Sequence, residues 1–508
     1  MDEQVCVGAP VAIARCPSRS CLVRFGANTK SQPHSSLFIP IQGLMRIYSN
    51  AKKTGDSLSN FMGLDEGGLD EGSAAELAKG RRFANASLPG YEGLYSVVLS
   101  ENGVLLAVER SPNPSTGDFD AEETLNLNGD WISPGGVDLQ INGALGLAFP
   151  DLDDRHIEPL MEICRFLGRQ GIDGFLPTLV TTAIANIHRA LAVIATVQRQ
   201  VQQESKPGVA QIWGVHLEGP CLNREKRGAH PQEHLQPLTL DVIKQILGDY
   251  ADCVKVVTLA PELDPTKSVI PYLRSLGIVV SLGHSQATAE QAQAAFDQGA
   301  TMVTHAFNAM PSLHHRKPGL LGAALVHPDV ACGLIADGQH VCPTMLEVLM
   351  RASRGDRVTT PTESRYPQEV FLVSDALSPL GLPDGTYPWD TRQIQIQNGT
   401  AQLEDGTLAG TTHPLLVGVQ NLVKWGICEP GEAIALATLA PRRALNLPQF
   451  PILLADASTE PSAELSADAS AAMQSSTASS THQSPCQISQ WLRWSLDPKT
   501  KILEWTPL

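Results

Sequence analysis

The stretch IVVSLGHSQATAEQAQAAFDQGATMVTHAF at residues 278–307 carries the pattern from which the fold follows. Its ends, IVVSLGH and MVTHAF, are short apolar runs of the kind that form buried strands. Between them, SQATAEQAQAAFDQG has the composition of a helix. A strand, a helix and a second strand in this order predict a βαβ unit with parallel strands.

The same alternation extends from Pro134 to about Arg443. Further strand patterns lie at 137–142, 175–180, 211–219, 254–262, 331–337 and 369–375, and a long helical pattern lies at 187–203. Seven or eight such units in ~300 residues favour a closed barrel over an open sheet. The sequence therefore predicts an α/β fold, a (β/α)8 TIM-like barrel, over residues 133–446.

Both ends of the chain carry hairpin patterns. LYSVVLSENGVLLAVE at 94–109 contains a Glu-Asn-Gly turn, and ISQWLRWSLDPKTKILEWTPL at 488–508 turns at Asp-Pro-Lys. We expect them to form one small β-sandwich domain from residues 81–132 and 447–508. Residues 1–80 lack periodicity and are expected to be a disordered extension or the result of a wrongly chosen start codon. The Ala/Ser-rich segment at about 455–485 is expected to be a disordered insertion.

Composition excludes several classes of partner. The net charge of −16 argues against nucleic acid, which usually requires a basic surface. No apolar stretch approaches the ~20 residues that span a bilayer, so we expect no membrane segment. The ten cysteines are scattered without CxxC pairs, and the acidic N-terminus does not resemble a signal peptide. These features predict a cytoplasmic protein with reduced thiols.

Four ionisable residues follow four of the predicted strands. Glu218 closes VHLEGP, His284 closes VSLGHS, His305 follows MVT, and Asp375 closes FLVSDA. The C-terminal ends of barrel strands form one face, so these side chains should converge. Two imidazoles and a carboxylate are a normal ligand set for a catalytic metal, and a further carboxylate nearby can transfer protons.

Each of these residues has a structural alternative when taken alone. A histidine at a strand end is more often a hydrogen-bonded structural residue than a ligand. Glu218 could be a solvated loop carboxylate, and Asp375 could cap the segment that follows it. The presence of four such groups at four strand ends is better explained by one functional site than by four unrelated structural roles.

Several longer motifs resemble a known family. In chain order they are GVHLEGPCLNREKRGAH at 214–230, VSLGHSQAT at 280–288, THAFNAMPSLHHRKPGLLGAAL at 304–325, IADGQHV at 335–341, VSDALSPLG at 373–381 and GTLAGTT at 406–412. Together they resemble the N-acetylglucosamine-6-phosphate deacetylases, which are metal-dependent barrel hydrolases of the amidohydrolase superfamily. The resemblance runs from about Ser133 to Ala444. It implies hydrolysis of the acetamide of N-acetylglucosamine 6-phosphate to glucosamine 6-phosphate and acetate.

The resemblance also implies residue roles. It makes Glu218, His284 and His305 the metal ligands and Asp375 the catalytic acid and base. His230 corresponds to a histidine that helps to polarise the substrate carbonyl.

The remaining roles concern the substrate. Asn308 and Ala309 match positions that bind the sugar phosphate, and His340 matches another substrate contact. Arg316 matches an arginine that reaches the phosphate in the neighbouring subunit of a homodimer, and a guanidinium suits that bidentate contact. Alternatively, Arg316 in HHRKPG is a solvated arginine in a surface loop that binds no substrate.

The end of the first predicted barrel strand carries Gln140-x-Asn142, where much of the superfamily has His-x-His for a second metal. Two amides cannot replace two imidazoles for a transition metal. We therefore expect one divalent metal per subunit, Zn²⁺ first, with Fe²⁺, Co²⁺ or Mn²⁺ as alternatives. Gln140 and Asn142 would lie beside it and bind water.

Two rival interpretations remain open. The chain could deacetylate another N-acetylhexosamine phosphate, because the sugar epimer cannot be read from the sequence. It could also be a non-catalytic barrel that binds a sugar phosphate, although such a protein should have lost a ligand or the acid/base.

Overall fold

The structure is a computed structural model that describes residues 80–100, 103–111, 124–204, 206–354, 370–447, 488 and 490–508. The predicted N-terminal extension, apart from residue 80, and the predicted insertion at about 455–485 lie outside the described residues.

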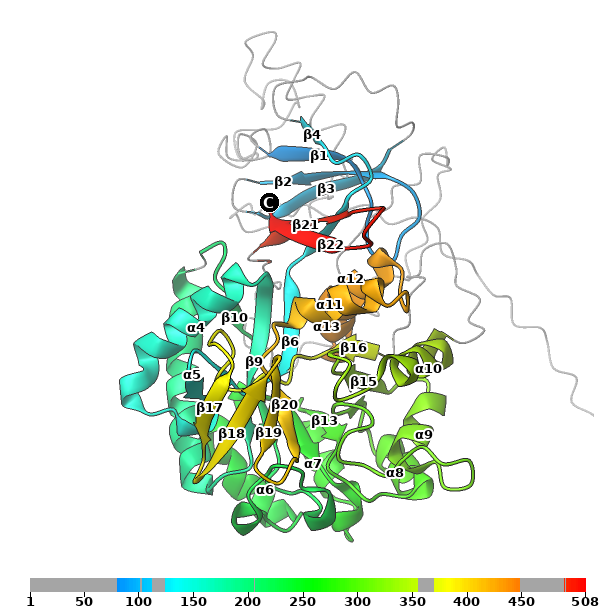
Figure 1. The fold of residues 1–508 in the computed structure, drawn as a ribbon. Helices are drawn as coiled ribbons and strands as arrows, with labels where there is room; N and C mark the ends of the chain where they lie inside the picture. The colour runs from blue at the N-terminus through cyan, green and yellow to red at the C-terminus, as the bar shows by residue number, and fades with distance from the viewer. Residues whose placement is uncertain are drawn as a thin grey trace, which may run out of the picture.

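A parallel barrel forms the larger part of the described chain (Figure 1). Its strands are β6 (Gly136–Ile141), β9 (Ile172–Val180), β10 (Gln211–Ile212), β11 (Val215–Glu218), β12 (Val254–Leu259), β13 (Val279–Leu282), β14 (Met302–Val303), β15 (Ala331–Leu334) and β16 (Val370–Leu372). β10 and β11 pair with successive parts of β9 and share one position, which leaves eight positions around the barrel. Every neighbouring pair is parallel, so the predicted barrel is confirmed.

The barrel closes between β6 and the segment that follows β16. Ile141 and Ala376 form a parallel bridge, and the backbone N–H of Asn142 donates to the backbone carbonyl of Ala376 at 2.7 Å. The backbone N–H of Asp375 donates to the backbone carbonyl of Gln140 at 2.9 Å. This closure brings the first and last strand ends together, although they lie more than 230 residues apart in the chain.

Helices follow the strands around the barrel. They are α4 (Ile157–Arg169), α5 (Ile184–Glu204), α6 (Leu240–Leu247), α7 (Val269–Ser275), α8 (Ala289–Asp297), α9 (Gly319–Val326), α10 (Pro343–Arg354), α11 (Leu415–Lys424), α12 (Pro430–Thr438) and α13 (Ala440–Ala444). The predicted helix at 187–203 is α5. The predicted helix at 285–299 is α8, which begins later because Thr288 caps it: the Thr288 hydroxyl and the Gln291 amide oxygen each accept the other residue's backbone N–H. Short 3-10 helices occupy loops, namely η1 (Phe149–Asp151), η2 (Asp154–His156), η3 (Arg224–Lys226), η4 (Gln232–His234), η5 (Gly248–Cys253) and η6 (Pro261–Leu263).

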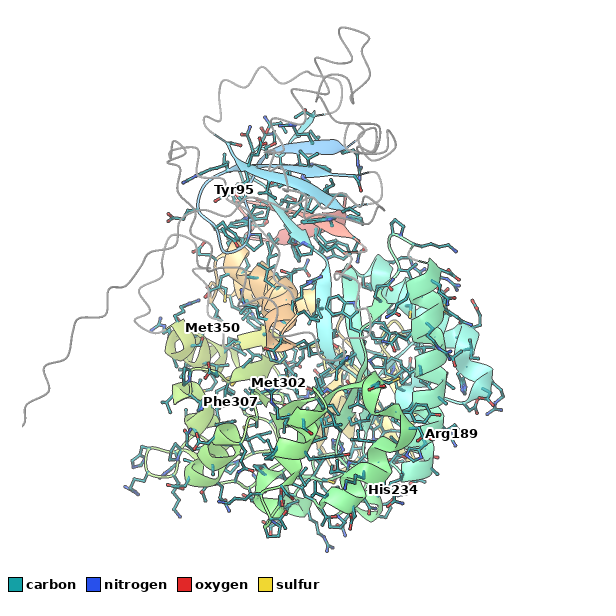
Figure 2. The ribbon with its side chains drawn as sticks, turned by 180° about the vertical axis from the view of Figure 1, so that it is seen from behind. Tyr95, Arg189, His234, Met302, Phe307 and Met350 are labelled. Carbon is teal, nitrogen blue, oxygen red and sulfur yellow. The ribbon has the colours of Figure 1, made fainter. Side chains whose placement is uncertain are left out.

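Side chains fill the barrel interior in layers. An apolar cluster includes Leu176, Val256, Val279, Met302 and Phe371, and Met302 is labelled in Figure 2. Nearer the C-terminal strand ends the filling becomes polar, with buried hydroxyls on β12 and β13. The polar end is therefore the open face on which chemistry can take place.

Strands from both chain ends lie side by side beyond the barrel (Figure 1). One sheet has the order β3-β2-β1-β4 and contains β1 (Arg81–Ala86), β2 (Tyr95–Leu99), β3 (Leu105–Arg110) and β4 (Thr124–Asn126). The other has the order β22-β21-β5 and contains β5 (Trp131–Pro134), β21 (Trp491–Leu496) and β22 (Leu503–Pro507). Both predicted hairpins are confirmed, and Trp491 packs in one core with Tyr95 and Ile132. The exact domain boundaries stay a prediction.

A further antiparallel sheet, formed by residues 385–411, was not expected. It has the order β17-β18-β19-β20 and consists of β17 (Gly385–Trp389), β18 (Arg392–Gln397), β19 (Thr400–Leu403) and β20 (Leu408–Thr411). Its signal is present in RQIQIQNGTAQL, where alternating isoleucines precede an Asn-Gly turn. A two-stranded piece, β7 (Gly143–Ala144) with β8 (Leu147–Ala148), follows β6. Within the described ranges, no helix is long and apolar enough to cross a membrane.

Candidate active site

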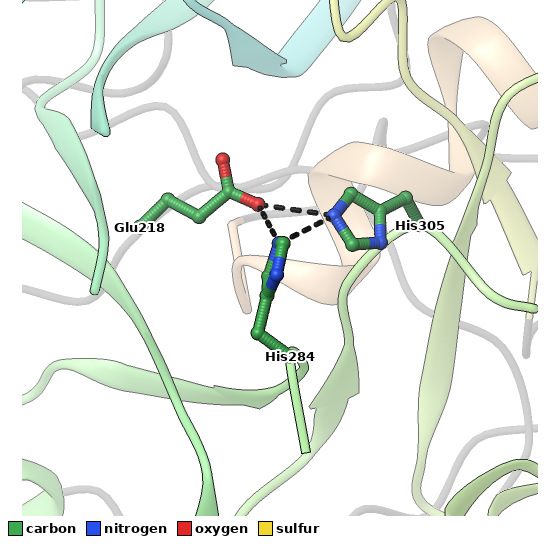
Figure 3. Close-up of side chains that lie close together, drawn as sticks. All are labelled: Glu218, His284 and His305. Carbon is green, nitrogen blue, oxygen red and sulfur yellow. Dashed lines mark hydrogen bonds and ion pairs between the residues drawn. The ribbon is translucent and has the colours of Figure 1, made fainter. Parts of the chain in front are cut away.

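Three predicted ligands meet at the C-terminal face of the barrel (Figure 3). Glu218 is the last residue of β11, and His284 and His305 follow β13 and β14 by two residues. The Nε2 atoms of both histidines lie 3.1 Å from the same oxygen of Glu218 and 3.0 Å from each other. All three side chains are buried.

The donor set fits a metal ion. His284 Nδ1 lies 2.8 Å from the Lys226 carbonyl, which can only accept, so Nδ1 carries the proton and the Nε2 lone pair faces the cluster. His305 Nδ1 is buried and has no partner among the described residues. Two imidazole nitrogens and a carboxylate oxygen converging on one point suit a divalent transition metal.

The loops that carry the cluster adopt a sparsely populated backbone conformation. His284, His305 and Asp375 have φ values of 48°, 25° and 48°, in or near the left-handed region. Non-glycine residues persist there only where surrounding contacts hold them, and they concentrate at functional sites. The coincidence of three such residues at three strand ends supports a functional site.

Asp375 lies beside the cluster and is held by two side-chain amides at the C-terminal end of β6. Gln140 Nε2 donates to Glu218 at 3.0 Å and to Asp375 at 3.2 Å, and Asn142 Nδ2 donates to Asp375 at 2.8 Å. Burial, together with the neighbouring Glu218 carboxylate, raises the pKa of Asp375 to about 7. A carboxyl group that titrates near neutral pH can both accept and donate a proton.

The charges of the cluster depend on one another. Burial alone would raise the pKa of Glu218, but the adjoining His284 and His305 side chains hold it well below its usual range. Burial opposes protonation of His305, yet the Glu218 carboxylate raises the pKa of that imidazole. The carboxylate is therefore ionised and available as a ligand.

His230 stands next to His284, with ring centroids 4.4 Å apart. Burial and the neighbouring His284 lower the pKa of His230 to about 3, so the ring is neutral. Its Nδ1 accepts from the Thr181 backbone N–H at 3.3 Å, and the Thr181 hydroxyl lies at 2.8 Å. The proton of the ring therefore sits on Nε2, where it can be donated.

A cavity of about 490 Å³ opens above the cluster, within the size range of small-molecule sites. Asn308, Ala309 and His340, predicted to contact substrate, line it together with the four ionisable residues and His230. Arg316 does not line it and is exposed, as are His314 and His315. Within this single chain the structure thus brings together every predicted site residue except Arg316.

A profile of the amidohydrolase family matches residues 131–449. The chain belongs to the amidohydrolase family. The N-acetylglucosamine-6-phosphate deacetylase of Bos taurus is 35% identical over 337 residues, which cover 64% of this chain and 77% of that protein. The N-acetylgalactosamine-6-phosphate deacetylase of Escherichia coli O157:H7 is 34% identical over 346 residues, covering 68% and 84%.

Solved structures give the same fold. A mutant of the N-acetyl-D-glucosamine-6-phosphate deacetylase of Mycobacterium smegmatis, in complex with N-acetyl-D-glucosamine 6-phosphate, superimposes with a TM-score of 0.61. It is 26% identical, and the match covers 73% of this chain and 91% of that one. The deacetylase of Thermotoga maritima is 27% identical with a TM-score of 0.58, covering 72% and 88%.

Part of the cavity lining was not predicted from the sequence. Trp389, Asp390 and Thr391 at the β17–β18 turn line its mouth, as do Thr407 to Ala409 before and within β20. The motif GTLAGTT contains the latter group but does not indicate a role for it. The alternation in β18 could have predicted a sheet, whereas its position over the cavity depends on tertiary contacts.

A buried histidine beneath the cluster was also missed. His216 Nδ1 lies 2.9 Å from the Leu139 carbonyl and Nε2 lies 2.8 Å from the Thr258 hydroxyl. Burial lowers its pKa to about 4, so it is neutral. The Thr258 hydroxyl is hydrogen-bonded to the Thr304 hydroxyl, which is in turn hydrogen-bonded to the Ser281 hydroxyl. This chain of hydrogen bonds connects His216 with three hydroxyl groups below the ligands.

His340, which lines the cavity, is paired with a carboxylate behind it. His340 Nδ1 lies 2.7 Å from Asp337, whose other oxygen accepts the backbone N–H groups of Gln339 and His340 at 2.9 Å. The lining of the cavity includes several carboxyl groups, and among described residues it includes no lysine or arginine. Anionic ligands must therefore find positive charge in imidazoles, in a metal or in another chain.

Proposed function

We propose that this chain hydrolyses the acetamide of N-acetyl-D-glucosamine 6-phosphate to D-glucosamine 6-phosphate and acetate, in the breakdown or recycling of amino sugars. The observation that carries the proposal is the Glu218–His284–His305 cluster next to Asp375, in a chain about 35% identical to deacetylases of this specificity. The reaction class is hydrolysis of a linear amide.

We propose one divalent metal per chain at Glu218, His284 and His305, with Zn²⁺ as the first candidate. When bound there, the cation would polarise the acetamide carbonyl and lower the pKa of a water molecule. Fe²⁺, Co²⁺ and Mn²⁺ accept the same ligands, so availability decides among them. A second metal is not proposed, because Gln140 and Asn142 offer only amides and donate to Asp375.

The chain's own residues account for the proton movements. Asp375 takes a proton from the attacking water and delivers it to the departing amine nitrogen, a role suited to a buried carboxyl group beside the cluster. The Nε2–H of His230 is free to donate to the carbonyl oxygen as negative charge develops there. Gln140 and Asn142 hold the Asp375 carboxylate in place.

The phosphate end of the substrate would lie against Asn308, Ala309 and His340, away from the reacting bond. Binding energy from this remote group would position the acetamide at the cluster. We propose that Arg316 completes the phosphate site from the neighbouring subunit of a homodimer, a role suited to its exposed guanidinium. We also propose a cytoplasmic location, supported by buried cysteines such as Cys164, which is a free thiol.

The direct test is acetate release from N-acetyl-D-glucosamine 6-phosphate by the full chain supplied with Zn²⁺, beside an Asp375→Asn variant. We expect turnover by the wild type and a loss of at least ~10²-fold in kcat in the variant, because the proton carrier is gone. Metal content measured on both samples should be equal. A metal-loaded wild type that releases no acetate contradicts the proposal.

The alternative substrate is the galactose epimer, because one of the similar relatives is named for it. Side-by-side kcat/KM values for the two N-acetylhexosamine phosphates would decide between them. A non-catalytic sugar-phosphate-binding barrel would bind both substrates without releasing acetate from either.

A further inference from the structure

A carboxylate outside the cavity connects the loops around one of the proposed ligands. Glu262 lies in η6, directly after β12, and does not line the cavity. Its Oε1 accepts from Asn223 Nδ2 at 2.9 Å and from the Gln286 backbone N–H at 2.6 Å. Its Oε2 accepts from the Ser285 hydroxyl at 2.6 Å. One side chain thus binds groups from two separate loops.

Both of these loops hold His284. Ser285 and Gln286 are the next two residues in the chain, so their bonds to Glu262 fix the backbone on the C-terminal side of His284. On the other loop, the Asn223 backbone N–H donates to the His284 carbonyl at 2.9 Å. The same loop supplies the Lys226 carbonyl, which accepts the Nδ1 proton of the imidazole at 2.8 Å.

Asn223 connects these two contacts. Its side-chain oxygen accepts the Glu225 N–H at 2.9 Å and caps η3, the turn that ends at Lys226. Its side-chain nitrogen is the group that donates to Glu262. The bond to Glu262 therefore orients the residue that starts the turn and, through the turn, the carbonyl that selects the tautomer of His284.

The backbone of His284 needs such support. Its φ of 48° lies in the left-handed region, which a histidine occupies only when its surroundings hold it. Charge-assisted hydrogen bonds to a carboxylate are among the stronger contacts available for this purpose. Three of them converge on Glu262, from the two residues that follow His284 and from Asn223, which is bonded to His284.

We propose that Glu262 is a positioning residue for the metal site, holding the His284 imidazole with Nε2 directed at Glu218 and His305. The inference rests on the proposed function, because it assumes that the cluster binds a divalent cation. Glu262 touches neither cation nor substrate and acts only through the loops that carry His284.

The test is metal affinity, measured on the full chain by competition with a chelating dye for Zn²⁺. In Glu262→Gln one oxygen is replaced by an NH₂ group that cannot accept, and the negative charge is lost. We expect the dissociation constant for Zn²⁺ to rise about 10- to 100-fold, the usual effect of losing a partner that orients a ligand. The absorption spectrum of the Co²⁺-loaded variant should also shift, because the geometry of one ligand changes.

Two further variants separate positioning from general stability. Glu225→Gln alters a neighbouring exposed carboxylate that accepts only from the Gln286 side chain in this region, and it should leave the Zn²⁺ affinity and the Co²⁺ spectrum unchanged. Ser285→Ala removes the bond to Oε2, together with the hydroxyl that accepts the Ala287 backbone N–H at 2.9 Å, and it should weaken Zn²⁺ binding by less than Glu262→Gln, even if the latter variant folds poorly.

Wild-type Zn²⁺ affinity and an unchanged Co²⁺ spectrum in folded Glu262→Gln or Ser285→Ala would overturn this inference while leaving the proposed function intact. A wild type that binds neither Zn²⁺ nor Co²⁺ would overturn both.

Discussion

The Nε2 atoms of His284 and His305 lie 3.0 Å apart in a buried site, and a single oxygen of Glu218 lies 3.1 Å from each of them. Two imidazole lone pairs at this distance repel unless a proton or a cation lies between them. The arrangement is therefore one that gains stability when a cation binds.

We expect Zn²⁺ to stabilise the folded chain against heat and urea. At a free concentration 100-fold above the dissociation constant the gain should be about 2.7 kcal/mol, because only the folded state holds the three ligands together. Denaturation with and without Zn²⁺ measures it. His305→Gln should abolish the gain, and titration should give one tightly bound ion per chain. Two tightly bound ions would contradict the single-site prediction.

Gly283→Ala should damage the same site through packing. A Cβ on Gly283 would lie 2.7 Å from the Thr304 Cβ. Gly283 directly precedes the ligand His284, and Thr304 directly precedes the ligand His305. The two strand ends would have to separate, which should cost about 1–3 kcal/mol and weaken Zn²⁺ binding. Chemical denaturation and metal titration test both effects. Gly385→Ala, where the nearest atom is 3.6 Å away, is the matched control and should change neither.

Asp337→Asn should impair substrate binding more than turnover. The asparagine can still accept the two backbone N–H groups, but its NH₂ group cannot accept from His340 Nδ1, so the imidazole loses its orientation. We expect KM for the phosphorylated substrate to rise about tenfold, equal to about 1.4 kcal/mol, with a small change in kcat. The non-phosphorylated sugar serves as the control substrate. A fall in kcat at unchanged KM would assign Asp337 a different role.

Arg316 can be tested by mixing two impaired variants of the chain. If it completes the neighbouring site, Arg316→Ala should raise KM, because a charged contact to phosphate is lost. Hybrid dimers of Arg316→Ala with Asp375→Asn would then contain one site in which both groups are intact. Steady-state assays of the mixture at low substrate concentration should show activity above the sum of the separate variants. Strict additivity would indicate that Arg316 does not cross between subunits.

Asp264 should make stability depend on pH. Its carboxylate accepts the backbone N–H groups of Thr266, Lys267 and Val269 at 2.9–3.0 Å, at the start of α7. Burial alone would raise the pKa of Asp264, but these bonds and the Thr266 hydroxyl hold it below its usual value. The folded state therefore binds this proton more weakly than the unfolded state. Its stabilising contribution is complete above the unfolded pKa of about 3.9 and is lost as pH falls through the folded pKa.

The corresponding variant is Asp264→Asn, in which one acceptor oxygen and the charge are lost. It should lower the free energy of unfolding by about 1–2 kcal/mol at pH 7. The difference from wild type should stay constant down to about pH 4 and narrow below it. Urea denaturation from about pH 7 to about pH 3 measures this. A difference that widens with acidity would refute the assignment.

Local patterns in the chain were sufficient to predict the barrel and most of the site. Period and composition identify the strands of the barrel, as in 278–284 and 302–307, because buried parallel strands are short and apolar whatever their neighbours. Glu218, His284, His305 and Asp375 could be placed together from strand ends alone, because in a parallel barrel all such ends share one face.

Tertiary structure decided how these groups are tuned and enclosed. The 2.8 Å bond from Asn142 to Asp375 exists only because the barrel closes between its first and last strands. The pKa of about 7 at Asp375 comes from burial and from Glu218, and neither is encoded in the residues next to it. The sheet β17–β20 over the cavity and the bonds of Glu262 join residues that are distant in the chain. Contacts of this kind depend on the packing of the whole barrel, and no local pattern of residues specifies them.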